Sequence, residues 1–287
     1  MREREVSSNQ LQAVNDRQAR NKPISLVADL YCRLHQMPKG MRHFFAHEIV
    51  PSVFTGEKRS LSEDSKKLLN GSKVEVFGSE NIPKSGPVVF VANHWSGGPV
   101  YGNWTYTLIS REVARAREDA SKDIRWIVNG DASVPVSGLP LPFSSRFIRK
   151  FANTYSMHVV GSDDRASGFK IRDSFKRGEL IGLFPEQDWT KTLQEGEEAS
   201  GMLLSALSNV RRDGLVCPVG VYNVDNRNNL YARFGQPFGI SYIFEISRPL
   251  PRGNVDRTRV YKRVADLLMR RINPLVPPWY RMPEIKK

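Results

Sequence analysis

Cysteine is scarce in this chain of 287 residues, which contains only Cys32 and Cys217. The two cysteines lie far apart in the sequence, and they fit neither a metal-binding spacing nor a redox motif. A small secreted domain stapled by disulfides is therefore excluded. The scarcity predicts a reduced chain that works in the cytosol.

Long hydrophobic runs are also missing. The apolar stretches GPVVFVA (86–92) and LIGLFP (180–185) are far shorter than the roughly 18 residues that cross a bilayer. The charged start MRERE has no apolar stretch behind it and does not form a secretory signal. We therefore expect a protein that does not cross a membrane, although it can lie on the surface of one.

Acidic residues are outnumbered, with 30 Asp and Glu against 43 Lys and Arg, for a net charge of +13. Such an excess attracts nucleic acid, anionic lipid, phosphorylated substrates or an acidic carrier protein, unless it serves only solubility. The sequence contains no helix-turn-helix, zinc-finger or RNP-like motif, so nucleic acid is not an expected partner.

The polar termini and a globular composition, 40% hydrophobic and 25% charged, indicate one main domain. We expect a mobile tail over 1–22, a helical hairpin over 23–70, an α/β domain over 71–277 and a basic tail over 278–287. Apolar residues at helical spacing in the hairpin either cover the core or lie in a lipid interface. His43 and His47 have the spacing of a helical metal pair, but apolar residues separate them and no metal is expected.

Strand-like and helix-like segments alternate from Lys73 onward. Helices are expected near 104–117, 145–153, 167–176, 200–212 and 260–272, with Gly178 and Gly214 as helix stops. The expected strands are 73–78, 86–92, 125–129, 156–161, 180–185, 215–222 and 230–235. The alternation predicts an α/β fold with a mostly parallel central sheet that helices cover on both faces.

Polar chemistry follows two of these strands. His94 comes after VVFVAN, and Glu186 comes after LIGLFP. Ligands of a parallel sheet bind outside the carboxyl ends of its strands, so we expect a site where these two residues lie.

The stretch VEVFGSENIPKSGPVVFVANHWS (74–96) resembles the first motif of the PlsC-type glycerolipid acyltransferases, in which Asn-His-x-Ser follows a strand. Further likenesses occur in the family's order. They are MHVVGSDDR, which ends at Arg165; Phe184, Pro185 and Glu186; VCPVGV (216–221); and ARFGQPF (232–238). Together they cover roughly residues 74 to 238.

The resemblance implies a fatty acyl transfer in which His94 acts as general base on the acceptor hydroxyl. An imidazole suits this role because its reference pKa, about 6.5, lies near operating pH. The donor would be acyl-CoA or acyl-carrier protein as co-substrate, without a metal or bound cofactor. The expected substrate-binding residues are Asn93, Ser96, Arg165 and Glu186, which lie in the matching motifs, and Gln187 and Lys191, which lie in the loop after Glu186.

Two positions depart from the family pattern. The family places an aspartate five residues after the histidine, where this chain has Pro99. It also has Gly-Thr-Arg after the glutamate, where this chain has Gln187, Asp188 and Trp189. An orienting aspartate matters, since in the serine-protease triad its replacement by the amide lowers kcat by about 10⁴.

Three explanations stay open. The first is that another carboxylate serves His94; Asp188 is the leading candidate, followed by Asp131 and Glu186. The second is an acceptor without phosphate, admitted through a wider mouth at Gly97-Gly98-Pro99. The third is a lipid-binding protein that has lost its chemistry. We expect the first, in an enzyme that acylates a lysophospholipid on the inner, cytoplasmic face of a membrane whose lipids are its partners.

Overall fold

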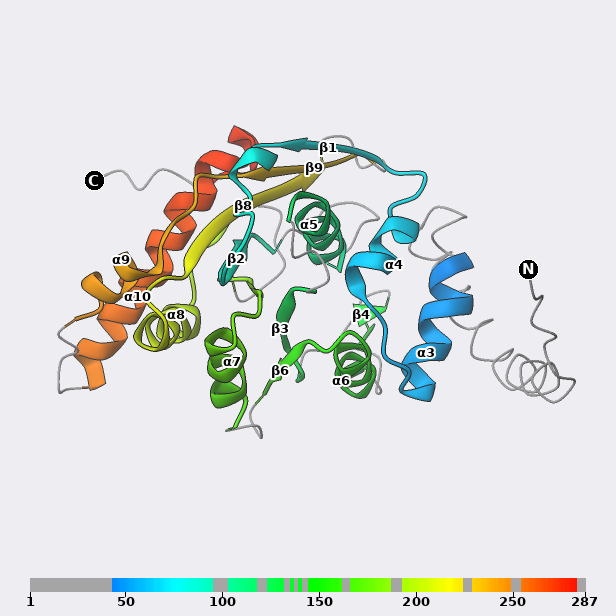
Figure 1. Cartoon of the computed structure of the whole chain (residues 1–287), viewed down its shortest axis with the longest axis horizontal. Coiled ribbons are helices and arrows are strands. Elements are labelled where there is room, and N and C mark those ends of the chain that lie inside the picture. The colour runs from blue at the N-terminus through cyan, green and yellow to red at the C-terminus, as the bar shows by residue number, and fades with distance from the viewer. Residues whose placement is uncertain are drawn as a thin grey trace, which may run out of the picture.

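The computed structural model describes residues 43–94, 103–117, 123–131, 135–136, 139–140, 144–161, 166–186, 193–223, 229–248 and 254–282. It is an α/β fold with a mostly parallel central sheet flanked by helices, which confirms the expected fold class. In Figure 1 the helices α4, α5 and α6 lie on one side of the sheet, and α7, α8 and α10 lie on the other.

The central sheet has the strand order β1-β9-β8-β2-β7-β3-β6, with β10 paired to β8. Pairing is parallel except between β8 and β9 and between β8 and β10. The strands are β1 (Lys73–Phe77), β2 (Val88–Ala92), β3 (Arg125–Asn129), β6 (His158–Val160), β7 (Ile181–Leu183), β8 (Leu215–Asn223), β9 (Asn229–Phe234) and β10 (Phe238–Gly239). A separate hairpin joins β4 (Pro135–Val136) to β5 (Leu139–Pro140).

The helices pack their apolar residues into one core with the sheet. They are α3 (Val50–Thr55), α4 (Leu61–Leu68), α5 (Asn103–Ala116), α6 (Ser144–Thr154), α7 (Ser167–Lys176), α8 (Glu198–Val210), α9 (Ile240–Ile246) and α10 (Asn254–Ile272). Short turns of other helix types are η1 (Phe45–Ile49), η2 (Ser79–Asn81), η3 (Asn273–Leu275) and η4 (Pro278–Tyr280).

Most of the expected strands and helices agree with these bounds to within a few residues, because their patterns reflect burial, but α10 begins at Asn254 and not near 260. The helix α9, the strand β10 and the β4–β5 hairpin were not expected. All five residues of β2 are buried, as its continuous apolar run requires of a central strand. Gly178 has φ 83° just after α7, as a helix stop should. The same expectation for Gly214 is wrong, since α8 ends at Val210. Gly214 is small for another reason: a Cβ there would lie 2.6 Å from Cζ of Phe175.

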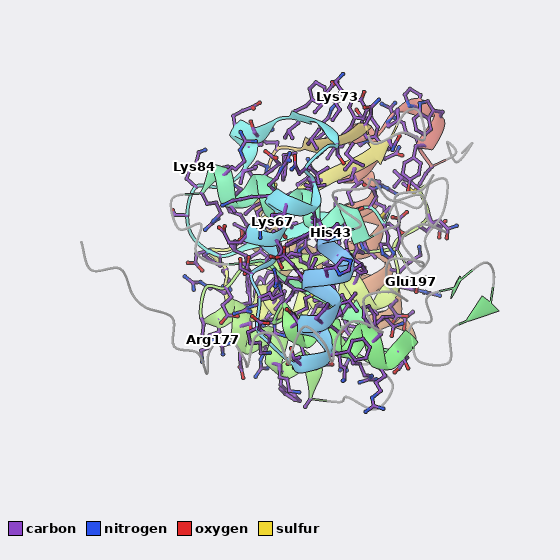
Figure 2. The ribbon with its side chains drawn as sticks, turned by 90° about the vertical axis from the view of Figure 1, so that its right-hand side faces the viewer. His43, Lys67, Lys73, Lys84, Arg177 and Glu197 are labelled. Atoms are coloured by element: carbon purple, nitrogen blue, oxygen red, sulfur yellow. The ribbon has the colours of Figure 1, made fainter. Side chains whose placement is uncertain are left out.

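Only the second half of the expected N-terminal hairpin lies within the described residues. It begins with His43 and Phe44 in α-helix and continues through the π-helix η1 into α3 at Val50. Pro51, a residue without an N–H, lies in the first turn of α3. His43 and His47 are both exposed, with ring centroids 4.5 Å apart. Figure 2 labels His43 on the side of the molecule that faces the viewer. Across the ranges given above, no group of three residues is arranged to hold a metal ion. No helix in those ranges is long and apolar enough to cross a membrane.

The segment after Pro277, expected to be a basic tail, contributes to the core at its start. Tyr280, in η4, is 0% exposed. Its backbone C=O accepts the N–H of Leu193 at 2.8 Å. The chain therefore continues to pack against the α/β domain through Tyr280.

Candidate active site

The site is built on the carboxyl ends of β2 and β7, which are neighbouring parallel strands. Val91 of β2 pairs with Leu183 of β7. His94 lies three residues beyond Val91, and Glu186 lies three residues beyond Leu183. The parallel register therefore carries both side chains past the edge of the sheet together, as the sequence predicted.

Glu186 joins two segments of chain through its carboxylate. Its Oε2 accepts the backbone N–H of His94 at 2.6 Å, and its Oε1 accepts the backbone N–H of Gln194 at 2.9 Å. The residue is 5% exposed. Burial raises the pKa of Glu186 to about 7, although the two N–H donors act in the opposite direction. This carboxylate therefore titrates near neutral pH.

The imidazole of His94 rests on a column of aromatic rings. It stacks on Phe184 with centroids 4.6 Å apart, and Phe184 stacks on Trp126 at 5.0 Å. Trp126 is fully buried in β3, and its Nε1 donates to Oγ of Ser110 at 3.0 Å. Because burial disfavours the imidazolium, the pKa of His94 falls to about 3. The ring is thus neutral at physiological pH and has the protonation state of a base.

Asn93, the residue before His94, is held by β8 and by the C-terminal turn. Its Nδ2 donates to the C=O of Val221 at 2.8 Å, and its Oδ1 accepts the N–H of Val221 at 2.7 Å. Its carboxamide also hydrogen-bonds the phenol oxygen of Tyr280. Asn93 is 0% exposed, so the structure places it behind the site, where it fixes the backbone that carries His94.

The three carboxylates considered for His94 lie in different situations. Glu186 meets the backbone N–H of His94. Asp131 follows β3 and bonds Nη2 of Arg149 at 2.6 Å. Asp188 lies outside the described residues, as do Ser96, Pro99, Arg165, Gln187 and Lys191.

Sequence reasoning missed three contributors to this geometry. Phe184 was noted only as part of a motif, yet its ring carries the imidazole. Gln194 contributes through its backbone N–H, which no residue pattern can signal. Tyr280 was assigned to a tail, although the aromatic pair Trp279-Tyr280 after two prolines was the available signal.

Comparisons with known proteins gave one kind of match. No family model matches the chain, and no curated protein sequence does. Among solved structures, the chain is similar to the crystal structure of the 1-acyl-sn-glycerophosphate (LPA) acyltransferase, PlsC, from Thermotoga maritima. The two share 16% sequence identity with a TM-score of 0.43, over 86% of this chain and 95% of that one. The α/β fold class stated above rests on the strand order and the helix layers themselves.

Proposed function

We propose that this chain is an acyltransferase that moves a fatty acyl group from acyl-CoA or acyl-carrier protein to a lysophospholipid. One observation carries the proposal: at the carboxyl ends of β2 and β7, the buried carboxylate of Glu186 binds the backbone N–H of His94, whose imidazole is neutral. Both belong to segments that resemble, in order, the motifs of one acyltransferase family.

The reaction needs only a base and two substrates. The imidazole of His94 takes the proton of the acceptor hydroxyl while that oxygen attacks the thioester carbonyl carbon. The new C–O bond forms, the C–S bond breaks, and the departing thiolate regains a proton from the imidazolium. Stacking on Phe184 and the Glu186 bond to the His94 backbone hold the ring in one place during these steps.

A carboxylate beside the ring would assist the base, because burial disfavours the imidazolium that forms. With a pKa of about 3, the imidazole gains a proton only at a cost of about 1.4 kcal/mol for each unit below the ambient pH. An aspartate beside the ring would lower this cost, as in the serine-protease triad. We assign that role to Asp188, which follows Glu186 by two residues in the sequence.

The acceptor is assigned from charge. Arg165 and Lys191 would hold the anionic headgroup, with Ser96 and Gln187 as further polar contacts, and the net charge of +13 favours anionic partners. The surface near α3 supports a position on a membrane. Phe54 is 47% exposed there, and Nζ of Lys150 lies 5.2 Å from its ring centroid. Exposed aromatic and cationic side chains together suit a bilayer interface.

The test is turnover by the purified protein. Acyl-CoA or acyl-carrier protein is supplied with a panel of lysophospholipids and non-phosphate acceptors, and release of free thiol is followed with acylated product. We expect thiol release to require an acceptor and to fall by at least about 100-fold in His94→Ala. His158→Ala is the matched control, because His158 is also a partly buried histidine with a lowered pKa, but lies on β6.

The outcomes separate the alternatives. If the protein turns over only acceptors that lack phosphate, its substrate is another lipid and not a lysophospholipid. Arg165 then does not have the role assigned to it. Binding to lysolipid vesicles without turnover from either donor favours a lipid-binding protein that has lost its chemistry. Equal losses in His94→Ala and His158→Ala, with both variants folded, remove His94 as the base.

A further inference from the structure

The C-terminal turn η4 contacts the site through Tyr280, at Asn93 and at Leu193. Each of these residues directly precedes a residue whose backbone N–H binds Glu186. The phenol oxygen of Tyr280 hydrogen-bonds the side chain of Asn93, the residue before His94. The backbone C=O of Tyr280 accepts the N–H of Leu193, the residue before Gln194, at 2.8 Å. His94 and Gln194 are the two residues whose N–H groups bind the oxygens of Glu186.

We infer that Tyr280 is a positioning residue that aligns the backbones of His94 and Gln194 on either side of the Glu186 carboxylate. The inference rests on the proposed function for its catalytic consequence, but its structural content does not depend on turnover. Tyr280 acts through Asn93 and Leu193 and touches no reacting atom in this scheme.

Burial makes this arrangement rigid. Tyr280 and Asn93 are both 0% exposed, so solvent does not compete for the hydrogen bond between them. Burial raises the pKa of Tyr280 beyond its usual range, and the nearby charge of Glu186 raises it further. The phenol therefore stays neutral throughout the physiological pH range, and the bond to Asn93 does not change with pH.

The carboxamide of Asn93 transmits the position of Tyr280 to the end of β2. It is already fixed on β8 by two hydrogen bonds to Val221. Tyr280 adds a restraint from a different element, so the backbone at Asn93 is held from two directions. Without the phenol hydroxyl, we expect the segment Asn93–His94 to rotate about the Val221 pair and lengthen the bond from His94 to Glu186.

The experiment removes only the hydroxyl, in Tyr280→Phe. Its matched control is Tyr155→Phe, because Tyr155 is 1% exposed and its hydroxyl donates to Oδ2 of Asp64 at 2.8 Å, outside the site. The first readout is hydrogen exchange at the His94 and Gln194 amides, measured relative to amides of β8. We expect Tyr280→Phe to accelerate exchange at the His94 amide by about tenfold, the equivalent of one hydrogen bond. The Gln194 amide should change less, because its link is the backbone C=O of Tyr280, which the variant keeps. Tyr155→Phe should leave both amides unchanged relative to β8.

The second readout is steady-state acyl transfer with protein of known folded fraction. We expect Tyr280→Phe to lower kcat by about fivefold to tenfold with KM within about twofold, since alignment and not substrate affinity is lost. A merely structural role would lower the melting temperature in both variants and leave the exchange ratio and kcat per folded molecule unchanged.

Every result decides the matter. Unchanged exchange at the His94 amide in Tyr280→Phe overturns the inference, whether or not the protein is active. Faster exchange with unchanged kcat in an active enzyme also overturns it, because the alignment then has no bearing on the reaction. If wild-type protein turns over no substrate, the proposed function fails, while the exchange measurement still judges the link from Tyr280 to Glu186.

Discussion

The carboxylate of Glu186 meets His94 at its backbone N–H, 2.6 Å away, while the imidazole ring stacks on Phe184. A carboxylate in this position fixes the backbone of His94, the proposed base. It leaves the ring nitrogens to other groups. The orientation of the imidazole and the placement of its backbone are thus separate functions, performed by different residues.

Activity should depend on the protonation state of Glu186. The ionised carboxylate accepts both N–H groups, whereas a protonated one presents an O–H toward one of them. Because the pKa of Glu186 is raised to about 7, we expect kcat to increase as pH rises through about 7. In Glu186→Gln the profile should be flat from pH 6 to 8 and kcat roughly tenfold lower. A wild-type transition that persists in Glu186→Gln assigns it to another group.

The raised pKa of Glu186 should also make folding stability depend on pH. A carboxyl whose pKa is raised from 4.5 to about 7 on folding stabilises the folded state fully below pH 4.5, and this contribution is lost as pH rises through 7. Denaturant unfolding of wild type and Glu186→Gln at pH 5 and pH 8 should therefore show the wild type losing up to about 3 kcal/mol relative to the variant. A difference that does not vary with pH contradicts the raised pKa.

Replacing the proposed acid partner should separate two candidate positions. We expect Asp188→Asn to lower kcat by about 100-fold to 10,000-fold, as loss of an orienting aspartate does. Asp131→Asn should change kcat by less than about twofold, because Asp131 pairs with Arg149 in a half-exposed ion pair. Single-turnover rates for both variants are the measurement. If Asp131→Asn lowers kcat more than Asp188→Asn does, the carboxylate that serves His94 is Asp131.

Replacing the ring of Phe184, on which the imidazole stacks, should change the pKa of His94. In Phe184→Leu the ring beneath the imidazole is lost and water gains access, so the pKa of His94 should rise from about 3 toward its ordinary 6.5. Proton NMR titration of the histidine ring signals measures this shift directly. Phe175→Leu is the control, since Phe175 is fully buried against Gly214 and its loss should leave His94 unchanged.

Two helical glycines should respond in opposite ways to alanine. A Cβ on Gly201 of α8 would lie 1.9 Å from the backbone O of Tyr261 in α10, so Gly201→Ala must separate two helices. We expect a loss of about 3 kcal/mol in free energy of unfolding. Gly168, in the first turn of α7, has nothing within 4 Å of such a Cβ, and Gly168→Ala should add about 0.5 kcal/mol. Thermal and denaturant unfolding of both variants give the comparison.

Local patterns predicted most of the strands and helices and the proximity of His94 to Glu186, because burial and parallel pairing show in the sequence. They missed α9, β10 and the β4–β5 hairpin. Contacts made by backbone atoms leave no such mark. The Gln194 N–H, the Val221 partner of Asn93 and the Tyr280 carbonyl all depend on register between distant segments. For the same reason, no pattern could reveal that Glu186 binds an amide and not the imidazole.

The strand β2 has a consequence for how the protein comes to be folded. Both of its partners, β7 and β8, are synthesised later, and the residue that secures Asn93 is 128 positions downstream. Closing loops of that length slows assembly of the sheet. Until the partner strands pair with it, the wholly apolar segment of β2 is exposed. We therefore expect the geometry of the candidate site to form late in folding, and the chain to be most prone to self-association before β7 and β8 have paired with β2.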